Sequence, residues 1–177
     1  MYYKIILNTF FILFVFVVQI SFISALPWYF SMLNLGVISL VLILIYADFE
    51  IAIVWSISLG LLFDFYFFEP FGLYIFSFLC ASLLIRFVFV GFITNQSLYS
   101  FLTLVVLALF LFQFFSQIFA YFLFFFNHEY LVVFFKSFFW EKILKQIFIN
   151  FVFAFLIFQF FSFISDKFKP FFLIKKR

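Results

Sequence analysis

The sequence predicts an all-α, polytopic membrane protein with about six transmembrane helices, and three observations lead to this prediction. Hydrophobic residues make up 70% of the chain and charged residues only 10%, whereas soluble domains average roughly 45–50% and 25%. The apolar residues form long runs, and about 20 apolar residues are enough to cross a hydrocarbon core of about 30 Å. Six such runs use nearly all of the 177 residues. We therefore expect a single transmembrane domain, with no room in these residues for a separate catalytic or nucleic-acid-binding domain.

The first two spans are expected at residues 5–25 and 32–47. No charged residue occurs between Lys4 and Asp48, and the break between the spans is Leu26-Pro27-Trp28-Tyr29. Proline ends a helix because it lacks an N–H donor, and tryptophan and tyrosine favour the membrane interface. The first run exceeds the roughly 7–15 apolar residues of a signal-peptide core, which favours a retained span over a cleaved signal.

The next three spans are expected at residues 51–63, 71–90 and 98–126. Short polar segments separate them, and each contains residues that favour turns: Asp48-Phe49-Glu50, then Asp64 with Glu69-Pro70-Phe71-Gly72, then Gly91 with Thr94-Asn95-Gln96. Such clusters punctuate apolar runs because they suit turn geometry. The third span is the shortest of the three.

Polar residues interrupt the apolar pattern between positions 127 and 146. In the second half of this segment Phe135, Phe139, Ile143 and Ile147 share one helical face, and Ser137, Glu141 and Lys145 share another. This pattern predicts an amphipathic helix in the membrane interface, where Trp140, Lys142 and Lys145 would suit the surface. The sixth span follows at residues 147–165, and residues 166–177 form a basic tail.

The distribution of basic residues predicts that both termini lie in the cytoplasm. With six spans, one side of the membrane carries seven lysines and arginines, and the other carries only Lys136, Lys142 and Lys145. Basic residues near a span favour the cytoplasmic side. The segment from Asp64 to Gly72 then faces outward. The net charge of +3 is thus interpreted as a topology signal and not as a nucleic-acid site.

Chemically reactive residues are few. His128 is the single histidine and Cys80 the single cysteine, so the sequence offers no His/Cys metal cluster and no disulfide framework. His128 beside Glu129 would make an acid–base pair, but a solvated loop histidine is the simpler interpretation. We expect no catalytic residue, no cofactor and no metal ion, and hence no enzyme.

Polar side chains within the spans are the sharper lead, because ionisable groups in a membrane are costly and suggest function. Asp64 is the strongest candidate, with capping of a helix end as the alternative. Arg86 is expected either to reach the cytoplasmic interface or to pair with an acid inside the bundle. Gln113 and Gln117 share one helical face and are expected to hydrogen-bond a neighbour such as Asn150.

The run Gly60-Leu61-Leu62-Phe63-Asp64, followed by a turn and Gly72-Leu73, resembles the signature of the MreD family, the membrane subunit of the bacterial rod-shape machinery. Pro70 matches a turn residue that often precedes the family's glycine. The Leu-Pro-Trp exit from the first span, the aromatic-rich segment before the last span and the basic tail are also similar. The chain departs from the family where Leu33-Asn34-Leu35 replaces a frequent Pro-Asp, and in span three, where Ala52, Ser56 and Gly60 are the small residues that remain.

The resemblance implies a non-enzymatic subunit of the bacterial cytoplasmic membrane. It would act through an MreC-type partner, with the MreB filament and the wall-synthesis enzymes, in peptidoglycan synthesis and cell shape. Asp64 would accept backbone N–H bonds in a tight outward turn shaped by Pro70 and Gly72.

An alternative from another class is the substrate-binding membrane subunit of an energy-coupling-factor vitamin transporter, which is also small, apolar and six-span. Such a subunit needs polar groups that converge on a pocket near its outer side. The sequence offers five candidates for that pocket: Asp64, Glu69, His128, Glu129 and Trp140.

Overall fold

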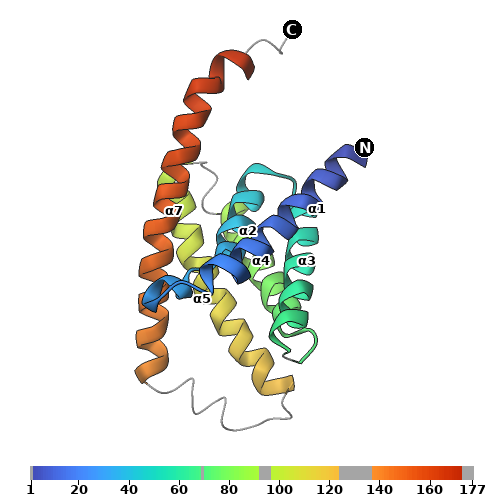
Figure 1. Cartoon of the computed structure of the whole chain (residues 1–177), viewed down its shortest axis with the longest axis vertical. Helices are drawn as coiled ribbons and strands as arrows, with labels where there is room; N and C mark the ends of the chain where they lie inside the picture. Colours follow the sequence, from blue (N-terminus) through green and yellow to red (C-terminus); the bar gives the residue numbers. More distant parts are fainter. Residues whose placement is uncertain (1, 69, 92–96, 124–136, 173–177) are drawn as a thin grey trace.

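The computed structural model describes residues 2–68, 70–91, 97–123 and 137–172, and within these ranges the regular structure is entirely helical (Figure 1). The elements in chain order are α1 (Tyr2–Val17), η1 (Val18–Ile23, a π-helical turn), η2 (Trp28–Met32, a 3₁₀ helix), α2 (Leu35–Tyr46), α3 (Phe49–Phe67), α4 (Leu73–Gly91), α5 (Leu98–Leu123) and α7 (Ser137–Phe172).

Five segments of the described chain are long and apolar enough to cross a bilayer: Ile6–Ile23, Phe49–Phe67, Leu73–Gly91, Leu98–Phe122 and Trp140–Phe160. The all-α membrane fold is therefore confirmed. The expected second span, residues 32–47, contains the shorter apolar helix α2 of 12 residues. At 1.5 Å per residue α2 is about 18 Å long, less than the hydrocarbon core of about 30 Å. This segment is lengthened by the residues before α2, which are the short helix η2 and the non-helical Leu33 and Asn34.

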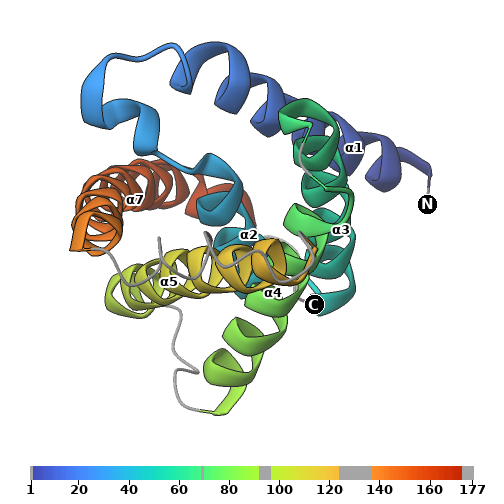
Figure 2. The same ribbon diagram turned by 90° about the horizontal axis from the view of Figure 1, so that it is seen from below.

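Helix α2 forms the centre of the bundle, with α1, α3, α4, α5 and α7 around it (Figure 2). Its residues Val41 and Leu44 have no exposed surface, and Val37, Ile38 and Leu40 are equally enclosed. A helix that is apolar all round belongs in a core. The other helices bury one face each and leave many large apolar side chains exposed, as lipid contact requires.

Small residues bring α3 and α4 together. Ala52, Ser56 and Gly60 lie on the buried face of α3. A Cβ atom added at Gly60 would lie 2.5 Å from the Cα and 2.7 Å from the backbone N of Ile75 in α4. The two backbones therefore touch at Gly60, which is the close approach that small residues permit between membrane helices.

The third span ends later than expected. Helix α3 continues through Asp64 to Phe67, whereas the sequence placed its end at residue 63. The added residues continue the buried face of α3, because Gly60, Phe63 and Asp64 are buried on the same face as Ala52 and Ser56. A charged residue does not end this helix, since its carboxylate is fully bonded, as described below.

From Ser137 onward, the residues expected to form the interfacial helix are continuous with the sixth span in one helix, α7. Ile143 is buried in the amphipathic part, and Asn150 and Ala154 are buried in the following turns. These spacings of seven and four keep one face toward the bundle, so no change of phase requires a break. The first part of the predicted segment, residues 127–136, and the end of the basic tail, residues 173–177, lie outside the described residues.

We predict that Gly60→Ala destabilises the protein by about 1–3 kcal/mol, the usual cost of overpacking, because the backbone of Ile75 must move. Gly91→Ala is the matched control. Gly91 is the last residue of α4, and a Cβ there would meet no atom of the described residues within 4 Å, so alanine should change the stability by less than about 0.5 kcal/mol. Thermal unfolding in detergent checks both changes, and equal melting temperatures for the two variants would contradict the close contact.

Candidate functional site

Asp64 joins the end of α3 to the start of α4. Its Oδ2 accepts a hydrogen bond from the backbone N–H of Gly72 at 2.9 Å, and its Oδ1 accepts one from the N–H of Tyr74 at 2.7 Å. Gly72 immediately precedes α4 and Tyr74 lies in its first turn, where N–H groups have no partner within the helix. The carboxylate thus caps α4 from the neighbouring helix, and its negative charge suits the positive end of the α4 dipole. Only 3% of Asp64 is exposed.

The turn itself runs from Phe68 to Gly72, one helical turn later than the sequence suggests. Phe68 ends α3 in the left-handed region, with φ 53°. Gly72 has φ 102°, a conformation that a residue with a side chain rarely adopts. The carbonyl of Pro70 accepts a bond from Leu73 N at 3.2 Å. The backbone bonds expected of Asp64 are present, and Gly72 shapes the turn through its positive φ. Glu69 lies outside the described residues.

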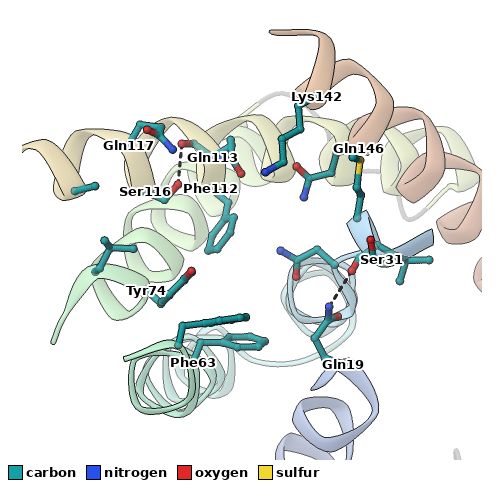
Figure 3. Close-up of a pocket in the computed structure, with 16 residues that line it drawn as sticks. Gln19, Ser31, Phe63, Tyr74, Phe112, Gln113, Ser116, Gln117, Lys142 and Gln146 are labelled. Carbon is teal, nitrogen blue, oxygen red and sulfur yellow. Dashed lines mark hydrogen bonds between the residues drawn. The ribbon is translucent and has the colours of Figure 1, made fainter. Parts of the chain in front are cut away.

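A polar cavity of about 560 Å³ lies beside this turn (Figure 3). Phe63, Tyr74 and Phe112 form much of its apolar wall, and Lys142 and Gln146 extend into it from α7. Its other polar lining residues come from the η1–α2 segment and from α5: Gln19, Ser31, Asn34, Gln113, Ser116 and Gln117. We call this cavity the polar pocket. Lys142 is the one charged side chain among the described residues that line it.

Two amide side chains hold the irregular segment from Met32 to Leu35, which forms one edge of the pocket. Gln19 donates to the carbonyl of Leu33 at 2.9 Å and accepts from the N–H of Leu35 at 2.8 Å. Asn150 donates to the carbonyl of Met32 at 3.1 Å and accepts from the N–H of Asn34 at 2.8 Å. These bonds satisfy backbone groups that a helix would otherwise pair.

The bonds of Asn150 differ from those expected. Its amide bonds Met32, Asn34 and the carbonyl of Gln146 at 2.7 Å, and among the described residues no bond from it to Gln113 or Gln117 is found. Gln113 and Gln117 line the polar pocket instead. The Oε1 atom of Gln117 is buried and has no hydrogen-bond partner among the described residues.

The remaining predicted residues lie apart from the pocket. The guanidinium carbon of Arg86 lies 5.6 Å from the ring centre of Phe49, a cation–π contact near the start of α3. Lys145 forms an ion pair with Glu141 on α7. Trp140 is 41% exposed. His128 and Glu129 lie outside the described residues.

Sequence reasoning missed Gln19, Asn34, Tyr74 and Gln146 as pocket residues. A usable signal existed for Gln19, which is a lone amide in a long apolar run and is therefore costly unless it is bonded. Asn34 caps α2 by accepting the N–H of Val37 at 3.1 Å. No local pattern marks Tyr74, because its position in the pocket wall depends on the hydrogen bond that its backbone N–H donates to Asp64.

The pocket offers hydrogen-bond donors and acceptors and one ammonium group. Amides both donate and accept, so they match peptide groups or the polar groups of a small molecule. In the described ranges no group of three or more His, Cys, Asp or Glu residues is placed to hold a metal ion.

We predict that Asp64→Ala lowers the free energy of unfolding by about 2–5 kcal/mol, because two N–H groups lose a charged acceptor. Asp48→Ala is the control, since Asp48 is exposed and its side chain makes no capping bond at the start of α3; it should change stability by less than about 0.5 kcal/mol. Detergent-phase thermal unfolding measures both. A loss for Asp64→Ala no larger than the control's would refute the capping role.

Comparison with known proteins gives one clear relationship. The family model described as rod shape-determining protein MreD matches residues 4–164, nearly the whole chain. No curated protein and no solved structure matches. The match includes the Gly60–Asp64 run, the turn and every described residue of the polar pocket. This chain belongs to the MreD family of rod shape-determining membrane proteins.

Proposed function

We propose that this chain is a non-enzymatic subunit of the bacterial cell-elongation machinery that binds an MreC-type membrane protein and, through it, the MreB filament and the wall-synthesis enzymes. The family match supports this role. The observation that carries it is the polar pocket, because a pocket lined with amides in an otherwise apolar bundle is suited to binding and lacks, among its described lining residues, any histidine, cysteine or carboxylate.

The chemistry of the pocket favours a peptide segment of the partner as its occupant. A peptide presents one donor and one acceptor at almost every residue, and the side chains of Gln113, Gln117 and Gln146 present both kinds of group. The buried Oε1 of Gln117 supplies an acceptor that has no partner among the described residues. Lys142 adds a positive charge, which suits a segment with an acidic residue or a carbonyl-rich turn.

We further propose that the protein lies in the bacterial cytoplasmic membrane with both termini in the cytoplasm. The start of α1 and the described end of α7 lie at one end of the bundle, and the turn from Phe68 to Gly72 lies at the other (Figure 1). The basic residues favour the cytoplasm for the first of these ends. The polar pocket, beside the turn, then opens toward the outer side, where the partner's segment would meet it.

Cysteine labelling tests this orientation. In a Cys80→Ala background, Phe71→Cys and Asp48→Cys place single thiols at exposed positions at opposite ends of α3 and α4. We expect a membrane-impermeant maleimide to label Phe71→Cys in intact spheroplasts and Asp48→Cys only after lysis. Labelling of Asp48→Cys in intact spheroplasts would show that the orientation is reversed.

Pocket variants test the partner role. We expect the double change Gln117→Leu and Lys142→Ala to weaken binding of the co-expressed MreC-type protein about tenfold, because two hydrogen-bonding groups are lost, and to fail to restore rod shape in cells depleted of their own MreD. Lys145→Ala is the control, because Lys145 lies outside the pocket.

Membrane levels and melting temperatures of these variants should match the unaltered protein. Full restoration of rod shape by the double variant would contradict the assigned role of the pocket. Tight co-purification of a vitamin with the unaltered chain would instead support the transporter alternative.

A further inference from the structure

A second cavity, of about 500 Å³, lies between α1 and α3 and shares no lining residue with the polar pocket. These helices lie side by side in both views of the bundle (Figures 1 and 2). Asn8, Thr9, Ile12 and Leu13 line it from α1. The α3 wall comprises Glu50, Ile51, Val54, Trp55, Ile57, Ser58, Leu61 and Leu62. We call it the α1–α3 groove.

The groove changes character along its length. Glu50 lies in the first turn of α3 and is exposed, and Asn8 lines the groove from α1. Farther along, Val54, Leu61 and Leu62 make the α3 wall apolar. A negative charge at the membrane surface followed by an apolar channel suits an amphiphile with a cationic head.

Trp55 gives the groove a second polar group, a hydrogen-bond donor, in addition to Glu50. The residue is 3% exposed and lines the groove, yet its indole N–H has no partner in the part of the chain that the structure describes. A buried donor without an acceptor is costly. Trp55 follows Glu50 by five residues, so it lies about 7.5 Å deeper along the helix. An acceptor at that depth would satisfy it.

The groove is long enough for an acyl chain. From Glu50 to Leu62 it extends about 18 Å along α3, and its volume of about 500 Å³ leaves room for a hydrocarbon chain beside the helix.

We propose that the α1–α3 groove binds a phospholipid whose headgroup carries a primary amine. The ammonium group would donate to the carboxylate of Glu50, an ester carbonyl would accept the N–H of Trp55, and one acyl chain would follow Val54, Ile57 and Leu61. The amide of Asn8, which lines the groove from α1, would donate to the phosphate. A primary ammonium suits Glu50 better than a quaternary one, because only the former donates hydrogen bonds.

Native mass spectrometry of the purified full-length chain tests this proposal. The probes are phospholipids with identical acyl chains and an ethanolamine, choline or glycerol headgroup. We expect the ethanolamine lipid to be retained preferentially. Glu50→Gln should reduce this preference about two- to fivefold, the range of an exposed ion pair, whereas Asp48→Asn, an exposed acid outside the groove, should leave it unchanged.

Trp55→Phe gives a different signature, because it removes only the N–H donor. We expect retention of all three lipids to fall about two- to tenfold with the headgroup preference intact, while the exposed Trp140→Phe changes nothing. Equal retention of the three lipids by the unaltered chain, or a preference that Glu50→Gln does not alter, would overturn the proposal. Cross-linking of Val54→Cys to a helix of a partner protein instead of to lipid would also overturn it.

Discussion

Backbone polar groups within a bilayer have no water to pair with, and this constraint explains where the few polar side chains of the chain lie. The described helices are interrupted at two places on the pocket side of the bundle. At one, Asp64 accepts the N–H groups of Gly72 and Tyr74. At the other, Gln19 and Asn150 pair with the backbone between Met32 and Leu35. In a chain with only 10% charged residues, these polar side chains are found where a helix cannot satisfy its own backbone.

The two interruptions also create the polar pocket, because α2 begins late and leaves space between its start, α5 and α7. The pocket residues then divide into two groups. Gln19 and Asn34 are bonded to backbone groups and maintain the pocket's shape. Gln117 keeps a buried oxygen without a partner in the described chain, and Lys142 extends into the space. The side chains that maintain the fold are therefore not the ones that leave hydrogen-bonding groups open in the pocket.

Local sequence patterns predicted the membrane fold, the helices α4 and α5 and the stripe of small residues on α3, because burial with a helical period determines these features. They also indicated Asp64 and Gly72. They failed where a distant contact changes the meaning of a residue. A charge normally argues against a continuing helix in a membrane, but the two N–H groups that bond Asp64 allow α3 to continue past it to Phe67. Asn150 pairs with backbone 116 and 118 residues away, which no local pattern encodes.

The amino-acid composition of the chain shows why Gly60 of the family signature is important. The chain has 42 phenylalanines and four glycines, and large rings fill part of the space between helices, as where Phe78 contacts both Phe63 and Phe112. Gly60 cannot be replaced in this way, because it meets the backbone of Ile75 and not a side chain that could move. Close approach at Gly60 brings the start of α4 within reach of Asp64, and the bond from Asp64 to the N–H of Tyr74 fixes a residue that lines the polar pocket. The signature residues therefore act on the pocket indirectly: they position one of its walls, and the amides of α5 and α7 complete the other.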